Sequence, residues 1–144
     1  MMRKTFQGLG WLSTVFCVGV ASAANSYDTT PFVDMWTTRS ESIHSSCSSG
    51  VADDVLGTSI TWSAGSAAGH IQAELIGKCV LDAKVNGKTA TASDQTCTDN
   101  GLTYVVGGTF SIQSDGTARL NEHVRVTGRG VSCTGSVNGP FQKQ

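Results

Sequence analysis

The sequence predicts an all-β protein, an antiparallel up-and-down meander of about seven or eight strands that closes into a small barrel. Polar and apolar residues alternate with a period of two over most of the chain, as in strands with one buried and one wet face. Turn dipeptides separate the alternating segments, and no long stretch has the period of an amphipathic helix. A barrel is favoured because closure removes exposed strand edges, and a β-sandwich is the alternative.

Each alternating segment has one face that is predicted to be buried. In chain order these faces are Leu56, Thr58, Ile60 and Trp62; Ile71, Ala73 and Leu75; Cys79, Leu81, Ala83 and Val85; Tyr104, Val106, Phe110 and Ile112; Ala118, Leu120, Val124 and Val126; and Val131, Cys133 and Val137. The predicted turns are at Asn86-Gly87, Asn100-Gly101, Asp115-Gly116 and Asn138-Gly139. Residues 40–54 have the least clear pattern, and a helical turn is allowed there.

Residues 1–23 have the three parts of a secretory signal peptide. Arg3 and Lys4 precede a mostly apolar run, and small residues at Ala21 and Ala23 suit a cleavage site. The run is too short to span a bilayer and no second one follows, so no transmembrane segment is predicted. We therefore expect a secreted or periplasmic protein that is cleaved near Ala23, with a flexible arm over residues 24–30 and a single β domain over residues 31–144.

The cysteines predict two disulfides. Five occur in the chain, and Cys17 is removed with the signal peptide, which leaves an even number in an exported protein. Cys79 and Cys97 flank the Asn86-Gly87 turn and are expected to pair across that hairpin, while Cys47 and Cys133 join the first and last strands. Four cysteines allow three pairings, of which this nested one is our prediction.

Several classes of function are disfavoured. A net charge of −1 without a basic run argues against nucleic-acid binding. The motifs G-x-S-x-G, H-E-x-x-H and the Walker loop do not occur, and C-x-x-C is also missing. The histidines lack a partner at metal-ligand spacing, so we predict no catalytic residue, no metal and no cofactor.

Glu122 breaks the alternation, because it is in register with Leu120 and Val124 on the face that is predicted to be inward. A buried carboxylate must be paired, protonated or beside a polar cavity. The alternative is a β-bulge near Asn121 that turns Glu122 outward.

Three large aromatic residues join Glu122 as candidate ligand-binding residues, namely Trp36, Trp62 and Tyr104. The alternative is that the tryptophans fill the core. Small inward residues, Ala73, Ala83 and Ala118, would suit either a hollow barrel or a narrow packed interior.

Residues 79–91, CVLDAKVNGKTAT, followed by Gln95, Thr96 and Cys97, resemble a pattern in small exported proteins of myxobacteria and their relatives. The resemblance implies a secreted, disulfide-bonded β-fold and no activity. The architecture is also loosely similar to that of lipocalins, where a tryptophan on the first strand is covered by an arginine from the last. Trp36 with Arg125 or Arg129 would play these parts, although the lipocalin G-x-W signature is absent.

These observations predict a non-catalytic β-barrel that binds a small apolar ligand or a protein partner. The first alternative is a structural surface protein, such as a coat or matrix component, which the Thr- and Ser-rich wet faces would suit. The second is a small hydrolase that uses Glu122 with His123 or His70.

Overall fold

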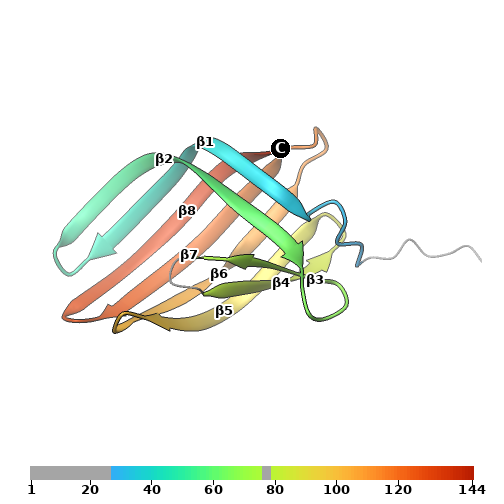
Figure 1. The fold of residues 1–144 in the computed structure, drawn as a ribbon. Helices are drawn as coiled ribbons and strands as arrows, with labels where there is room; N and C mark the ends of the chain where they lie inside the picture. Colours follow the sequence, from blue (N-terminus) through green and yellow to red (C-terminus); the bar gives the residue numbers. More distant parts are fainter. Residues whose placement is uncertain (1–26, 76–78) are drawn as a thin grey trace, which may run out of the picture.

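Eight antiparallel strands form one closed barrel in the computed structural model, which describes residues 27–75 and 79–144 (Figure 1). The strands are β1 (Asp34–Cys47), β2 (Gly50–Ala64), β3 (His70–Glu74), β4 (Val80–Asn86), β5 (Thr89–Asp99), β6 (Leu102–Ile112), β7 (Ala118–Gly128) and β8 (Val131–Lys143). They follow one another around the barrel in chain order, and β8 pairs with β1. The predicted all-β barrel is confirmed, whereas the predicted signal peptide lies outside the described residues.

Two of the predicted turns have the backbone that their residue types favour. Gly87 has a φ of 58°, and Asn100 and Gly101 have φ values of 49° and 75°. These positive values match the tight hairpin turns in which glycine and asparagine carry the least steric cost. Asp115 and Gly116 also lie in a turn, between β6 and β7.

The turn predicted at Asn138-Gly139 is wrong, because both residues lie inside β8. A Cβ atom on Gly139 would lie 3.1 Å from the Cα atom of Glu41, so glycine permits a close approach of strands there. The chain turns between β7 and β8 at Arg129 instead, where φ is 50°.

The helical turn allowed for residues 40–54 is also wrong, since these residues belong to the hairpin of β1 and β2. The register of this strand pair shifts between Thr38 and Glu41. The shift inverts the alternation, so that Trp36 and Ile43 share the inner face despite an odd sequence separation. This inversion obscures the strand pattern in the sequence.

One end of the barrel, where β1 and β7 begin, is filled by aromatic side chains, and we call it the closed end. The Phe110 ring packs against Trp36, Trp62 and Phe141 with centroid distances of 5.2, 5.7 and 5.9 Å. Phe32 precedes β1, is fully buried, and accepts a 2.8 Å hydrogen bond from the Trp36 indole at its carbonyl oxygen.

The predicted small inward residues Ala73, Ala83 and Ala118 belong to this same core. Their small size makes room for the aromatic rings at the closed end, so this part of the interior is packed.

The opposite end, where β1 ends and β8 begins, is the open end. β3 and β4 have 5 and 7 residues, whereas β1 and β2 have 14 and 15. The barrel wall is therefore low at β3 and β4, and Figure 1 shows the neighbouring strands extending beyond them. Most of β2 from Gly50 to Ser59 is exposed, because β3 pairs with this strand only at Ser63 and Ala64.

Both predicted disulfides are confirmed. Cys47 and Cys133 lie directly opposite each other on β1 and β8, with their Cα atoms 4.0 Å apart. Cys79 and Cys97 join the start of β4 to β5. Such crosslinks are typical of an oxidising compartment outside the cytoplasm. Within residues 27–75 and 79–144, no helix is long and apolar enough to cross a membrane.

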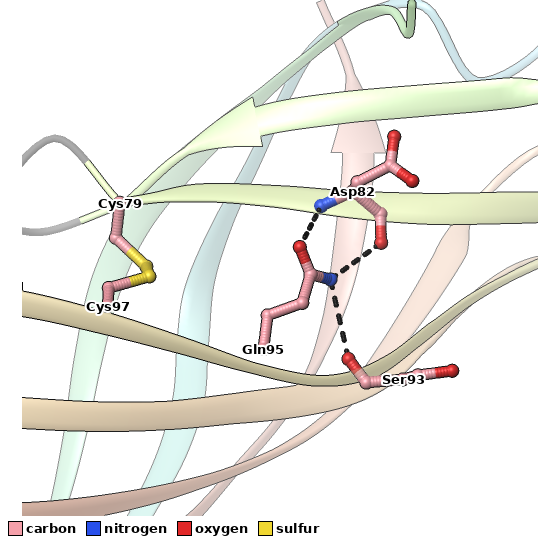
Figure 2. Close-up of a disulfide and its surroundings, with 5 residues drawn as sticks. All are labelled: Cys79, Asp82, Ser93, Gln95 and Cys97. Atoms are coloured by element: carbon pink, nitrogen blue, oxygen red, sulfur yellow. Dashed lines mark hydrogen bonds between the residues drawn. A yellow bond between two sulfur atoms is a disulfide. The ribbon is translucent and has the colours of Figure 1, made fainter. Parts of the chain in front are cut away.

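The Gln95 side chain bridges a gap between β4 and β5 (Figure 2). The ladder between these strands ends at Lys84 and Thr91, and the register of β5 shifts before Gln95. The Gln95 amide accepts a hydrogen bond from the Asp82 backbone N–H at 2.9 Å and donates one to the Asp82 carbonyl at 2.7 Å. A side chain thus supplies the two hydrogen bonds of a missing strand neighbour.

We expect Gln95→Ala to lower the free energy of unfolding by about 2 kcal/mol, because it leaves a backbone donor and acceptor without partners. The control is Gln113→Ala, which removes an exposed contact to a neighbouring carbonyl and should cost less than about 0.5 kcal/mol. Urea unfolding of both disulfide-bonded variants measures the difference. Equal losses would show that the Gln95 bridge contributes no special stability.

Candidate functional site

A cavity of ≈ 510 Å³ occupies the barrel interior on the open side of the aromatic core. Its wall is largely aliphatic and includes Val106, Leu120, Val124, Val126 and Val137. Glu74, Leu75 and Cys79, beside the low wall, also border it. This volume lies within the range of about 300–1,000 Å³ that is typical of small-molecule sites.

Glu122 lines this cavity. β7 pairs with both of its neighbours without a register shift, so Glu122 keeps the inward direction of Leu120 and Val124. The alternative of a bulge near Asn121 is therefore wrong. On β6, Gly108 lies opposite Glu122, and a Cβ atom there would come within 2.3 Å of the Asn121 carbonyl oxygen. Only glycine fits at this point of close strand approach.

Glu41 is a second inward carboxyl, which the alternation in the sequence did not predict. It is 6% exposed and lines the same cavity. The register shift after Thr38 turns Glu41 inward, whereas uninterrupted alternation from Trp36 would have turned it to solvent. The signal in the sequence was the odd separation between Trp36 and Ile43, which requires a bulge if both face inward.

The two carboxyls lie on either side of β8, on its inner face. Val137 on β8 pairs with Glu122 of β7 on one side and with Ile43 of β1 on the other. Glu41 is the inward residue of β1 that precedes Ile43. It lies beside Gly139, which has no side chain to separate the two glutamates.

The pKa of Glu122 is raised to about 7. Burial makes the largest contribution, the charge of Glu41 adds to it, and His123 opposes both effects. Burial also raises the pKa of Glu41 above its usual range. Over the described residues, neither carboxyl has a protein hydrogen-bond donor or a Lys or Arg partner. Glu122 can therefore exchange a proton near neutral pH.

The predicted ligand-binding residues divide between the two parts of the interior. Tyr104 and Glu122 line the cavity. Trp36 and Trp62 lie in the packed core at the closed end, where they are 1% and 2% exposed. The structure places Trp62 at the boundary, since it borders a void of ≈ 10 Å³ that Glu122 also lines. The Trp62 indole N–H has no hydrogen-bond partner among the described residues.

The three histidines each pair with an aspartate: His44 with Asp53 at 2.5 Å, His70 with Asp82 at 2.6 Å, and His123 with Asp94 at 2.6 Å. The His123 pair is largely exposed, whereas the adjacent Glu122 faces the cavity. Glu122 and His123 thus point to opposite sides of the barrel wall. His70, the other histidine considered in the hydrolase alternative, pairs with Asp82 of β4.

The lipocalin-like pairing of Trp36 with Arg125 or Arg129 is wrong. Both arginines lie toward the open end, on β7 and in the turn after it, whereas Trp36 is at the closed end. The cation near the Trp36 ring is Lys143 of β8, at 5.7 Å from the ring centroid.

No protein-family model, curated protein or solved structure matches this chain. The resemblance of residues 79–97 to exported myxobacterial proteins stays a prediction.

Proposed function

We propose that this protein is an exported, non-catalytic barrel that binds a small ligand with an apolar body in its interior. The cavity on the open side of the core carries this proposal, because it combines a ligand-sized volume with an aliphatic wall and a low rim at β3 and β4. The filled aromatic end would give such a ligand a firm floor.

Two further observations support parts of the proposal. The two disulfides suit a protein that is exported, in agreement with the signal peptide predicted over residues 1–23. The outward orientation of His123 and its pairing with Asp94 separate it from Glu122, which favours binding over acid–base chemistry by that pair.

The cavity can be tested with Nile red, a neutral apolar dye whose fluorescence rises in apolar surroundings. We expect the disulfide-bonded protein to bind it, and Val124→Trp to weaken the binding by about tenfold or more because the indole would occupy cavity volume. The matched control is Val55→Trp on β2, where the native side chain is 62% exposed and does not line the cavity.

The control variant should bind the dye as the native protein does. Failure of the native protein to bind Nile red, or equal binding by Val124→Trp and Val55→Trp, would contradict the proposed function.

A further inference from the structure

Building on the proposed function, we infer that the cavity takes a cationic ligand, an amine on an apolar body whose ammonium group lies between Glu41 and Glu122. Three features of the cavity support this ligand: a buried carboxylate without a protein partner, a second carboxylate beside it, and a lining that offers no positive charge.

The first feature is the buried Glu41 carboxylate. The residue is more than nine-tenths buried and lines the cavity. No described residue donates a hydrogen bond to its carboxylate or forms an ion pair with it. Buried charges in proteins are normally paired, because the cost of removing a carboxylate from water is large. The missing partner of Glu41 would be supplied by the contents of the cavity.

The second feature is the position of Glu122 beside Glu41. It lines the same cavity from β7, across the inner face of β8, and the two carboxylates are close enough for the charge on Glu41 to disfavour ionisation of Glu122. Gly139 beside Glu41 and Gly108 opposite Glu122 carry no side chain that could separate the two carboxylates. A cation placed there would interact with both carboxylates at once.

The third feature is the charge of the residues that line the cavity. It contains three carboxylates, at Glu41, Glu74 and Glu122, and no lysine, arginine or histidine. An anionic ligand such as a fatty acid would meet like charges there. An ammonium group reverses the sign of each of these interactions, and the aliphatic wall suits the rest of an amphiphilic amine.

The test compares three ligands that share one alkyl chain: decylamine, 1-decanol and decanoic acid. Each competes with Nile red at pH 8, where Glu122 is mostly ionised. We expect decylamine to displace the dye at about a tenfold lower concentration than decanol, and decanoate to be the weakest competitor.

Variants locate the preference. Glu41→Gln and Glu122→Gln should each reduce the advantage of decylamine over decanol to about threefold or less, because each removes one of the two carboxylates that face the ammonium group. The matched control is Asp54→Asn, which also converts a carboxyl to an amide, but at an exposed residue of β2 that does not line the cavity, and it should keep the native preference. Thermal unfolding of each variant verifies that it is folded.

The pH provides a second measurement that needs no substitution. The preference for decylamine should decline from pH 8 to pH 5 as Glu122 is protonated. The other titratable groups near this site are Glu74 on the rim, Tyr104 on β6 and His123 on the outer face. The positions opposite Glu122 on β6 and β8 are Gly108 and Val137.

The outcomes separate this inference from the proposed function. If Nile red binds but the three competitors act equally, or if Glu41→Gln and Glu122→Gln keep the native preference, the inference is wrong and the apolar site stands. If Nile red does not bind the native protein, the proposed function itself fails.

Discussion

Replacement of both Cys47 and Cys133 by alanine should lower the free energy of unfolding by about 4–5 kcal/mol. This crosslink spans 86 residues of sequence, and its main effect is to restrict the unfolded chain. In the folded protein it joins β1 to β8, the two strands that close the barrel. Denaturant unfolding at 25 °C under non-reducing conditions measures the loss.

The other disulfide provides the comparison. Cys79 and Cys97 are separated by 18 residues, so the same reasoning gives about 3 kcal/mol for their double replacement by alanine. A larger loss for Cys79 and Cys97 than for Cys47 and Cys133 would show that loop closure is not the main source of stabilisation.

A second large effect concerns pH. The pKa of Glu122 rises from an ordinary value of 4.5 to about 7 in the folded protein, so the folded state binds the proton more tightly than the unfolded state does. Its contribution to stability is complete below about pH 4.5 and is lost as the pH rises through about 7. From this group the native protein should lose about 3 kcal/mol between these limits.

The Glu122→Gln variant isolates this contribution. It should show a much smaller loss of stability between pH 4.5 and pH 8, and at pH 8 it should be more stable than the native protein by about 1–3 kcal/mol. The residual slope would come from Glu41, whose pKa burial also raises. A Glu122→Gln variant less stable than the native protein at pH 8 would contradict this account.

These stability effects bear on the ligand-binding proposal. A carboxylate that destabilises the folded protein at neutral pH has no role in holding the barrel together, and such costs are common at binding sites. The expected combination for Glu122→Gln is therefore a more stable protein that binds an amine less well. A general loss of structure would lower both quantities.

The alternation, the turn dipeptides and the cysteine positions predicted the fold class, most of the strands and the two disulfides that the structure confirms. The alternation around Leu81, Ala83 and Val85 survives in the structure because β4 has one buried and one outer face. The cysteine pairing followed from the position of Cys79 and Cys97 on either side of a confirmed hairpin turn. Such local patterns depend on neighbouring residues and can be read without a tertiary structure.

The position of the cavity and the residues that line it depend on relations between strands that a local sequence pattern does not contain. The inward direction of Glu41 depends on a register shift relative to β2, which is a relation between strands and has no local signature. The low wall at the open end of the barrel is present because β3 and β4 are shorter than the strands around them. Glu41 and Glu122 are 81 positions apart in the sequence, and they line the same cavity because barrel closure places β1 and β7 on either side of β8.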